Sequence, residues 1–312
     1  MSACSKLPSS VGRPRDVAVI STTVDTVLVQ RTIQIYNYYP QREPTFIFIF
    51  APITGMKNVS NFSTVFLYGS LEDSFIKTLL NAKAREATQK DTITLFKINN
   101  VWAKDQNVVI LAVSHPEYLE AAMVRCKDTI KKLLEGSYYE NLKKGYYEQG
   151  IDQPIKTTLA QYGFTVDLQK GWLVDSTFRK ERFIFVHTHF PDRSIFFYKE
   201  RMSGVLSDSF GFAKRNALTK KYYHGDYILK DLTSTENIEF HGMQGMRLKG
   251  VWQNDSLVAG GPFLSYFLIE SDTLYIIDGI LFLPGERKTD YFTAIEVIMN
   301  SNEIIKPKHA SP

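Results

Sequence analysis

The segment from Gly245 to Leu283 holds the pattern that most constrains the fold of this chain. It contains three strongly apolar runs, at 246–252, 263–270 and 273–282, separated by residues typical of turns. Successive runs of this length and composition, with short connections, predict an antiparallel meander. Such a sheet buries at least one face, so helices from elsewhere in the chain are expected to pack against it.

The first half of the chain mixes strand and helix patterns. The expected strands are 16–20, 46–50, 65–68, 93–98 and 107–113, and the expected helices are 24–39 and 72–89. The clearest helix follows Ser114-His115-Pro116-Glu117, because Ser and Glu three residues apart with Pro between them are typical of a capping box. Apolar residues then recur at helical spacing from Leu119 to Leu134, which predicts one buried helix face.

The second half adds further helices and strands around the meander. The expected helices are 155–162, 212–223 and one after Gly285, and the expected strands before the meander are 172–174, 183–188 and 194–198. We therefore expect an α+β fold of two related units, each a mostly antiparallel sheet with helices packed on one face. The expected divisions are a tether at 1–15, α+β halves at 16–150 and 151–305, and a disordered tail at 306–312.

The two halves share the pattern Val-Trp-x-x-Asp, at 101–105 and at 251–255. Each copy precedes a strand and then an amphipathic helix, which suggests an internal duplication. On this interpretation Trp102 and Trp252 are equivalent structural residues whose indole rings are mostly buried at the start of a strand. The alternative is chance, because only three of the five positions match.

Composition excludes two classes of protein. The formal net charge is only +4, and the Lys residues cluster in short pairs within helical segments. Because there is no long basic run, no nucleic-acid partner is expected. No apolar run reaches the roughly 18 residues of a membrane-spanning helix. The two cysteines, Cys4 and Cys126, make no disulfide framework, and Cys126 falls on the apolar face of a helix.

Cys4 points to the location of the protein. Met1-Ser2-Ala3-Cys4, followed by Ser, Lys and Pro residues, matches the end of a bacterial lipoprotein signal in which Cys4 is lipidated. This interpretation predicts a basic and then apolar stretch encoded in frame upstream of Met1. It places the protein at the cell envelope, anchored to the outer membrane or on its periplasmic face, whereas an unprocessed Cys4 would leave it in the cytoplasm.

Four ordered motifs in the chain resemble domain-of-unknown-function family 4837 (DUF4837). They are Leu7-Pro8-Ser9-Ser10-Val11-Gly12-Arg13-Pro14, Val101-Trp102-Ala103-Lys104-Asp105-Gln106, Gly250-Val251-Trp252 with Gly260-Gly261-Pro262-Phe263-Leu264-Ser265-Tyr266, and Asp278-Gly279-Ile280-Leu281-Phe282-Leu283-Pro284. Asp105 stands where the family has Pro, and Ile280 where an aromatic residue is usual. The resemblance covers nearly the whole chain and implies a lipoprotein of a Gram-negative group with no assigned reaction.

His187 and His189 are candidate metal ligands. Alternate residues of a strand project from one face, so the two imidazoles of 183–189 lie on the same side. Asp192 or His224 could complete a site, but the sequence does not fix a third ligand. Phe183 and Phe185 share that face, so half-buried or surface histidines are the favoured interpretation.

Gly260, Gly261, Ser265 and Tyr266 are candidate ligand-lining residues. Gly260-Gly261-Pro262 lacks the strand-to-helix context and the Lys of a phosphate loop, so a turn or a close approach of backbones is favoured. The many tyrosines could instead form a platform for a protein or a glycan, although rings packed on a sheet explain them better.

No catalytic set stands out in the sequence. We expect a lipid-anchored envelope protein that binds or scaffolds without catalysis and uses no cofactor. Its partners are expected to be the membrane, through the lipid, and a protein or glycan. The alternative is a metal-dependent hydrolase centred on His187 and His189.

Overall fold

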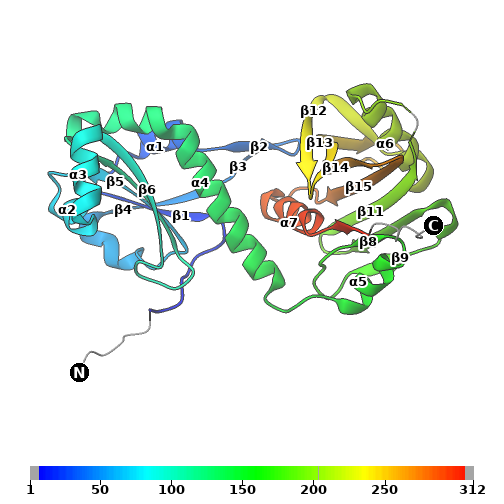
Figure 1. The fold of residues 1–312 in the computed structure, drawn as a ribbon, viewed down its shortest axis with the longest axis horizontal. Coiled ribbons are helices and arrows are strands. Elements are labelled where there is room, and N and C mark those ends of the chain that lie inside the picture. The colour runs from blue at the N-terminus through cyan, green and yellow to red at the C-terminus, as the bar shows by residue number, and fades with distance from the viewer. Residues whose placement is uncertain (1–6, 203, 306–312) are drawn as a thin grey trace, which may run out of the picture. The chain divides into compact units, whose positions relative to one another are not determined.

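The computed structural model describes residues 7–202 and 204–305, and Cys4 therefore lies outside the described residues. Two compact units form, and each is treated by itself (Figure 1). The first unit extends to Tyr36 and then from Pro44 to Gly145, while Asn37–Glu43 and the chain from Tyr146 onward form the second. The predicted α+β fold with two sheet-containing units is confirmed.

The first unit is built on a five-stranded sheet in the order β4-β1-β5-β7-β6. Its strands are β1 (Asp16–Ser21), β4 (Ile47–Pro52), β5 (Thr64–Ser70), β6 (Ile93–Asn99) and β7 (Asn107–Val113). Its helices are α1 (Thr26–Ile33), η1 (Ile53–Asn58), α2 (Ser74–Leu79), α3 (Ala82–Asp91), η2 (Pro116–Tyr118) and the start of α4 (Leu119–Tyr147).

The central strands of this sheet are buried on both faces. All residues of β1 and β5 are buried, because α1 and α4 cover one face of the sheet while α2 and α3 cover the other. Three of the four neighbouring strand pairs run parallel, and only β6 and β7 are antiparallel. This sheet therefore differs from the antiparallel one expected, as continuous apolar strands alternating with helices favour parallel pairing.

Two local predictions in the first unit are wrong. The helix expected over 24–39 ends at Ile33, and Tyr36–Tyr38 is a strand, since β-branched and aromatic residues dominate that stretch. The expected capping box does not form: a 3-10 turn intervenes and α4 begins at Leu119. The backbone N–H of Ser114 donates a hydrogen bond to the carbonyl of Thr92. Ser114 therefore continues the pairing of β7 with the chain before β6 and does not cap a helix.

The second unit is built on a seven-stranded sheet in the order β12-β13-β14-β15-β11-β10-β9, antiparallel throughout. Its strands are β9 (Leu173–Asp175), β10 (Phe183–Thr188), β11 (Asp192–Arg201), β12 (Tyr227–Phe240), β13 (Met243–Asn254), β14 (Ala259–Glu270) and β15 (Thr273–Phe282). The meander expected from 246 to 282 is therefore confirmed, and β12 extends it by a strand that the sequence analysis missed.

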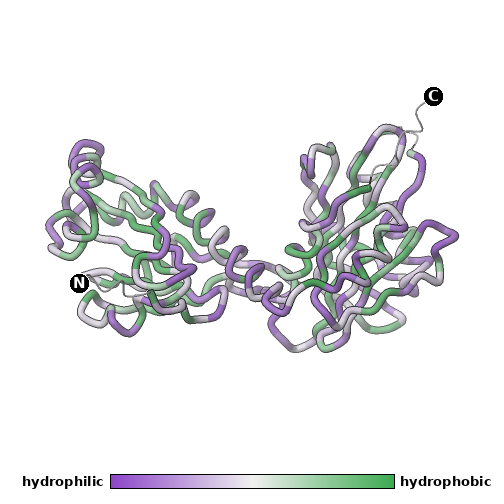
Figure 2. The backbone as a smooth tube through the Cα atoms, turned by 60° about the horizontal axis from the view of Figure 1, so that its bottom comes forward, coloured by the Kyte–Doolittle hydropathy of each residue, from purple (hydrophilic) through white to green (hydrophobic). Residues whose placement is uncertain are grey.

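Helices cover both faces of this sheet. Gly211 of α6 (Asp208–Tyr222) packs on Met246 and Leu248, whereas α7 (Thr289–Asn300) packs on the opposite face at Gly279. Smaller elements complete the unit: η3 (Arg179–Glu181), α5 (Gln153–Ala160), the pair β8 (Phe164–Thr165) and β16 (Glu303–Ile304), and residues 37–43 of the hairpin β2 (Tyr36–Tyr38) and β3 (Arg42–Pro44). Figure 2 shows hydrophobic stretches along the strands.

The two Val-Trp segments are not structural equivalents. Trp102 lies in the loop between β6 and β7 and is only partly buried, whereas Trp252 lies inside β13 and is 4% exposed. The sheets around them differ in strand order and in strand direction. The suggested duplication therefore has no counterpart in the fold, although Trp252 is a core residue as expected.

A buried carboxylate holds residues 37–43 in place within the second unit. Glu43 is 3% exposed and accepts hydrogen bonds from the backbone N–H groups of Lys288 and Thr289 at 2.9–3.0 Å. The Thr289 hydroxyl donates to the same carboxylate at 2.8 Å. A negative charge at the first N–H groups of α7 complements the helix dipole, which explains how a charged residue can be buried there.

No helix among the described residues is long and apolar enough to cross a membrane.

Candidate binding site

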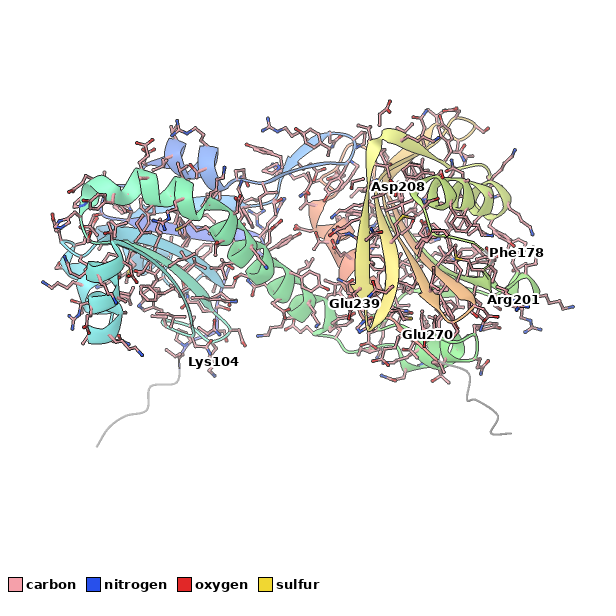
Figure 3. All side chains as sticks on the ribbon, turned by 45° about the horizontal axis from the view of Figure 1, so that its top comes forward. Lys104, Phe178, Arg201, Asp208, Glu239 and Glu270 are labelled. Atoms are coloured by element: carbon pink, nitrogen blue, oxygen red, sulfur yellow. The ribbon has the colours of Figure 1, made fainter. Side chains whose placement is uncertain are left out.

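Three chain segments meet at one end of the seven-stranded sheet. They are the β10–β11 turn (189–191), the β13–β14 turn (255–258) and the last residue of β15 with those that follow it (282–286). They share this end because Asn254 pairs with Ala259 and Asp192 pairs with Phe282. We call these segments the loop end. Charged residues occupy the other end of the strands, where Figure 3 labels Arg201, Glu239 and Glu270.

The loop end exposes large apolar side chains. Phe190 is 99% exposed and Val258 is 91% exposed, and both have the positive φ angles of tight turns. Single exposed apolar residues are common on proteins, but two nearly complete exposures at the same end of one sheet are typical of a surface that meets a ligand or partner. Leu257 adds a third apolar side chain, 61% exposed.

Two open hollows flank Phe282 and Pro284, which line both. The first, the Trp252 hollow, has a volume of about 560 Å³, and the second, the Phe190 hollow, about 640 Å³. The Trp252 hollow is lined by Pro40, Leu229, Val251, Trp252, Gln253, Asn254, Asp255, Val258, Ala259, Gly260, Gly261, Phe282 and Pro284. The Phe190 hollow is lined by His189, Phe190, Pro191, Asp192, Phe282, Leu283, Pro284, Glu286 and Tyr291.

The glycine pair shapes the Trp252 hollow. A Cβ atom on Gly261 would lie 2.1 Å from the carbonyl oxygen of Leu281, and one on Gly260 would lie 2.9 Å from that of Trp252. Neither position can hold a side chain without moving a strand. The sequence therefore requires glycine at both places for a close approach of backbones, and the space left in front of them becomes part of the hollow.

Ser265 and Tyr266 do not line either hollow, in contrast to the expectation for them. Ser265 is fully buried under α6, where its hydroxyl donates to Asp278. Tyr266 points to the opposite face, where its hydroxyl lies 2.8 Å from the side-chain oxygen of Asn300. Both residues lie in the middle of β14, away from the end of the sheet, and strand alternation points their side chains to opposite faces.

His187 and His189 come together only in part. Their ring centroids lie 5.5 Å apart, and Nδ1 of His189 lies 2.7 Å from a carboxylate oxygen of Asp192. His224 lies in the turn between α6 and β12. Within the part of the chain that the structure describes, no group of three or more His, Cys, Asp or Glu is placed to hold a metal ion.

The lining of the two hollows is acidic. It contains the carboxylates of Asp192, Asp255 and Glu286 and no Lys or Arg. Asp255 accepts a hydrogen bond from the Tyr227 hydroxyl at 3.1 Å, but neither Asp255 nor Glu286 forms an ion pair with a residue of the described chain. These charges are therefore available to a ligand of opposite sign.

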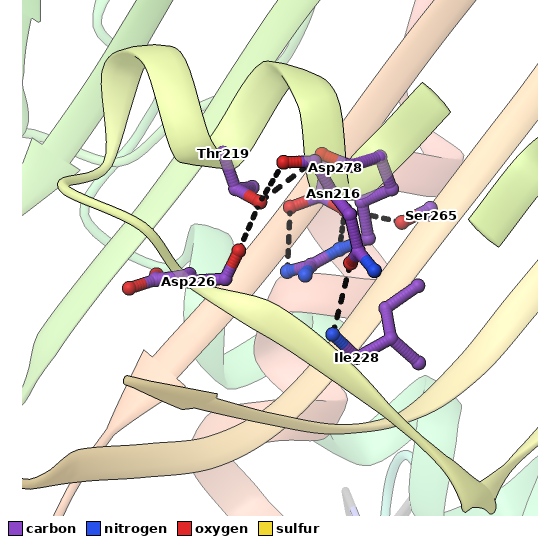
Figure 4. Close-up of polar contacts among 7 residues, drawn as sticks. Asn216, Thr219, Asp226, Ile228, Ser265 and Asp278 are labelled. Atoms are coloured by element: carbon purple, nitrogen blue, oxygen red, sulfur yellow. Dashed lines mark hydrogen bonds and ion pairs between the residues drawn. The ribbon is translucent and has the colours of Figure 1, made fainter. Parts of the chain in front are cut away.

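A buried polar network lies behind the loop end, between α6 and the sheet (Figure 4). Arg215 and Asp278 are both 0% exposed, and Nε of Arg215 donates to Asp278 at 2.7 Å. The Thr219 hydroxyl donates to the carbonyl of Asp226 at 2.6 Å, while the Asn254 amide donates to the Asp226 carboxylate at 2.8 Å. Burial raises the pKa of Asp226, and the Asn254 amide acts in the opposite sense.

This network fixes the base of the β13–β14 turn. Asn254 is the last residue of β13, and its side-chain oxygen also accepts the N–H of Leu257 at 3.0 Å. The turn that carries Val258 is therefore tied to a core that excludes water. A well-defined hollow at the tip of a hairpin follows from this arrangement.

Sequence reasoning missed most of the loop end. Phe190 and Val258 look like ordinary strand-flanking residues, and only their positions at tight turns leave them exposed. A usable signal was available for Phe190, because Phe190-Pro191-Asp192 between two strands is typical of a turn, and an aromatic residue at a turn is unusual.

Known proteins resemble the chain only weakly in structure. Cyanobacterial PsbP (CyanoP) from Synechocystis sp. PCC 6803 matches at 11% identity over 46% of this chain and 88% of its own, with a TM-score of 0.33. LpqN of Mycobacterium tuberculosis, described as involved in cell envelope biogenesis, matches at 14% identity over 46% and 84%, with a TM-score of 0.29. Similarity at this level supports no argument about function.

None of the curated proteins matches the chain. The family model of a domain of unknown function, DUF4837, matches residues 152–301, which confirms the family resemblance seen in the sequence. The matched residues include both turns of the loop end and the glycine pair, while the two motifs in the first half lie outside them. The second half of this chain therefore matches the DUF4837 family model.

Proposed function

We propose that this protein is a binding protein of the cell envelope whose loop end takes a segment of a partner protein. The segment would place an apolar side chain in the Trp252 hollow and basic residues against the carboxylates that line the two hollows. The observation that carries the proposal is the nearly complete exposure of Phe190 and Val258 beside two open hollows.

The exposed side chains supply a driving force for binding. Burying a Phe or Val side chain in an interface releases about 1.5–3 kcal/mol relative to leaving it in water. Phe190 and Val258 lie at two turns on the same end of the sheet, on either side of β15, and we propose that one extended partner segment covers both. The hollow behind them gives this apolar surface the concave shape typical of peptide-binding sites.

The acidic lining of the two hollows selects the kind of partner. Asp192, Asp255 and Glu286 favour Lys or Arg on the bound segment and disfavour an anionic membrane surface. Apolar residues flanked by basic ones therefore fit this site better than an acidic segment or a lipid headgroup does. Charge complementarity of this kind contributes mainly to specificity and to the rate of association.

The place of the protein at the envelope rests on the sequence around Cys4. Lipidation there would tether the chain to a membrane, leaving the loop end free to reach a partner. Changing Cys4 to Ser tests this part: the variant should leave the membrane fraction, whereas the wild-type protein should stay in it. Equal fractionation of the two proteins would contradict the tether.

Two synthetic peptides test the charge preference. Isothermal titration calorimetry compares the sequence KKLFKK with EELFEE on the purified protein. The basic peptide should bind at least about tenfold more tightly, equivalent to about 1.4 kcal/mol. Asp255→Asn with Glu286→Gln should remove most of this difference, and equal affinities on the wild-type protein would contradict the proposed partner.

A further inference from the structure

Arg193 lies on the α7 face of the second sheet in an unusual setting. It follows Asp192 in β11 and shares a face with Ile195, which lies beside Gly279 of β15 on the face that α7 covers. Its guanidinium carbon lies 5.3 Å from the ring centre of Trp172 and 5.7 Å from that of Tyr291. The guanidinium is therefore held between two aromatic rings.

This arginine has no anionic partner in the described chain. Within residues 7–202 and 204–305 its side chain takes part in no ion pair and no hydrogen bond, and its Nε is buried without an acceptor. Other arginines of the unit do have carboxylate partners: Arg201 pairs with Asp272 and Arg215 pairs with Asp278. Burial lowers the pKa of Arg193, and Tyr146 and Tyr291 act in the opposite sense.

A partly buried guanidinium without a counterion is costly, so the arrangement favours an anion. The aromatic rings fix the plane of the group while its terminal N–H groups stay free to form the paired bonds that carboxylates and phosphates accept. Both ring residues are themselves anchored, since Trp172 Nε1 donates to the Tyr146 hydroxyl at 3.1 Å and Tyr291 is part of α7.

Tyr146 provides a second donor beside Arg193. Its oxygen accepts the Trp172 bond and also contacts the Gln169 backbone, while no hydrogen bond among the described residues uses its own hydrogen. Burial raises the pKa of Tyr146 to about 12, so the hydroxyl stays protonated at neutral pH and is able to donate. Arg193 and Tyr146 together present donors without acceptors.

We propose that Arg193 and Tyr146 bind an oxyanion, either a carboxylate or a phosphate. This site shares Tyr291 with the Phe190 hollow, but it differs from the proposed partner site because it takes a ligand of opposite charge. The two aromatic rings suit the planar guanidinium of Arg193, which can form two hydrogen bonds to one anion. A Lys side chain at this position could not replace it.

NMR spectroscopy of arginine side chains tests the site on the whole protein. The Nε–H signal of Arg193 is followed as sodium phosphate or sodium acetate is added, with ionic strength kept constant by sodium chloride. Saturable movement of this signal with either salt supports the proposal, and the more effective salt identifies the anion. Absence of saturation with both salts overturns it, without any variant being needed.

Substitutions then separate anion binding from packing. Arg193→Lys keeps the charge but should lower the affinity for the anion by about tenfold, because one charge-assisted hydrogen bond is lost. Tyr146→Phe should weaken it less, and Arg201→Lys, at an exposed arginine of the same unit, should leave it unchanged. Equal weakening by Arg201→Lys would show a non-specific charge effect and would contradict the assigned site.

Discussion

Replacing Arg215 by Met should destabilise the second unit more than any surface change. Arg215 and Asp278 are both 0% exposed, joined by contacts of 2.7 and 3.3 Å, and the guanidinium lies 4.0 Å from the Phe263 ring. Met fills a similar volume but leaves the Asp278 carboxylate with only Ser265 as a donor. Breaking a buried pair in this way costs about 3–5 kcal/mol.

The expected loss is large enough to measure directly. For a domain of this size, about 1 kcal/mol corresponds to a fall in Tm of about 2–4 °C, so Arg215→Met should lower Tm by about 6–20 °C. Differential scanning calorimetry and urea unfolding followed by tryptophan fluorescence both report it. Arg201→Met is the matched control, because its pair with Asp272 is 83% and 62% exposed and should contribute about 1 kcal/mol or less.

A second variant separates the unpaired charge from the lost packing. Arg215→Met combined with Asp278→Leu removes both charges and should recover most of the stability, since apolar replacement of a whole buried pair is often close to neutral. A double variant no more stable than Arg215→Met would refute the reasoning. So would a loss below about 1 kcal/mol in the single variant.

Three further changes have defined outcomes. Glu43→Ala removes the carboxylate that caps α7 and should cost about 2 kcal/mol in urea unfolding, and no loss would show that solvent satisfies the helix end equally well. Gly261→Ala should cost about 2–3 kcal/mol through overpacking, whereas Gly136→Ala, with open space around its Cβ position, should stabilise α4 by about 1 kcal/mol; a harmless change at 261 would contradict the close approach. The hydrogen bond that the His115 ring donates to Glu72 raises the pKa of His115 above 6.5, so its stabilisation is present below that value and lost as pH rises through the raised pKa. His115→Gln should therefore flatten the pH dependence of unfolding in that window, and an unchanged profile would exclude the pair as its source.

Strand and helix positions were largely predictable where one apolar pattern ran uninterrupted. The meander at 246–282 follows from residue type and spacing alone, because each strand is followed by a short turn. Strand direction in the first unit was not predictable in this way. Buried parallel and antiparallel strands carry the same apolar residues, and only the intervening helices α1, α2 and α3 distinguish them.

The candidate site was predictable only in part. Gly260 and Gly261 could be identified because a glycine pair in a strand indicates close backbone contact. Arg215 and Asp278 lie 63 residues apart, and their sequence surroundings give no sign that they pair. The exposure of Val258 depends on how a turn ends, and element ends are the least predictable feature of a sequence.

Changing one of two equally exposed valines tests the proposed binding site most directly. Val258 at the loop end is 91% exposed, and Val205, beyond the far end of β11, is 85% exposed. Val258→Ser should weaken binding of the basic peptide KKLFKK by about tenfold, because burial of the side chain contributes about 1.5 kcal/mol. Val205→Ser should leave the affinity unchanged, and both variants should melt like the wild-type protein. Equal affinities for Val258→Ser and the wild-type protein would contradict a binding site at the loop end.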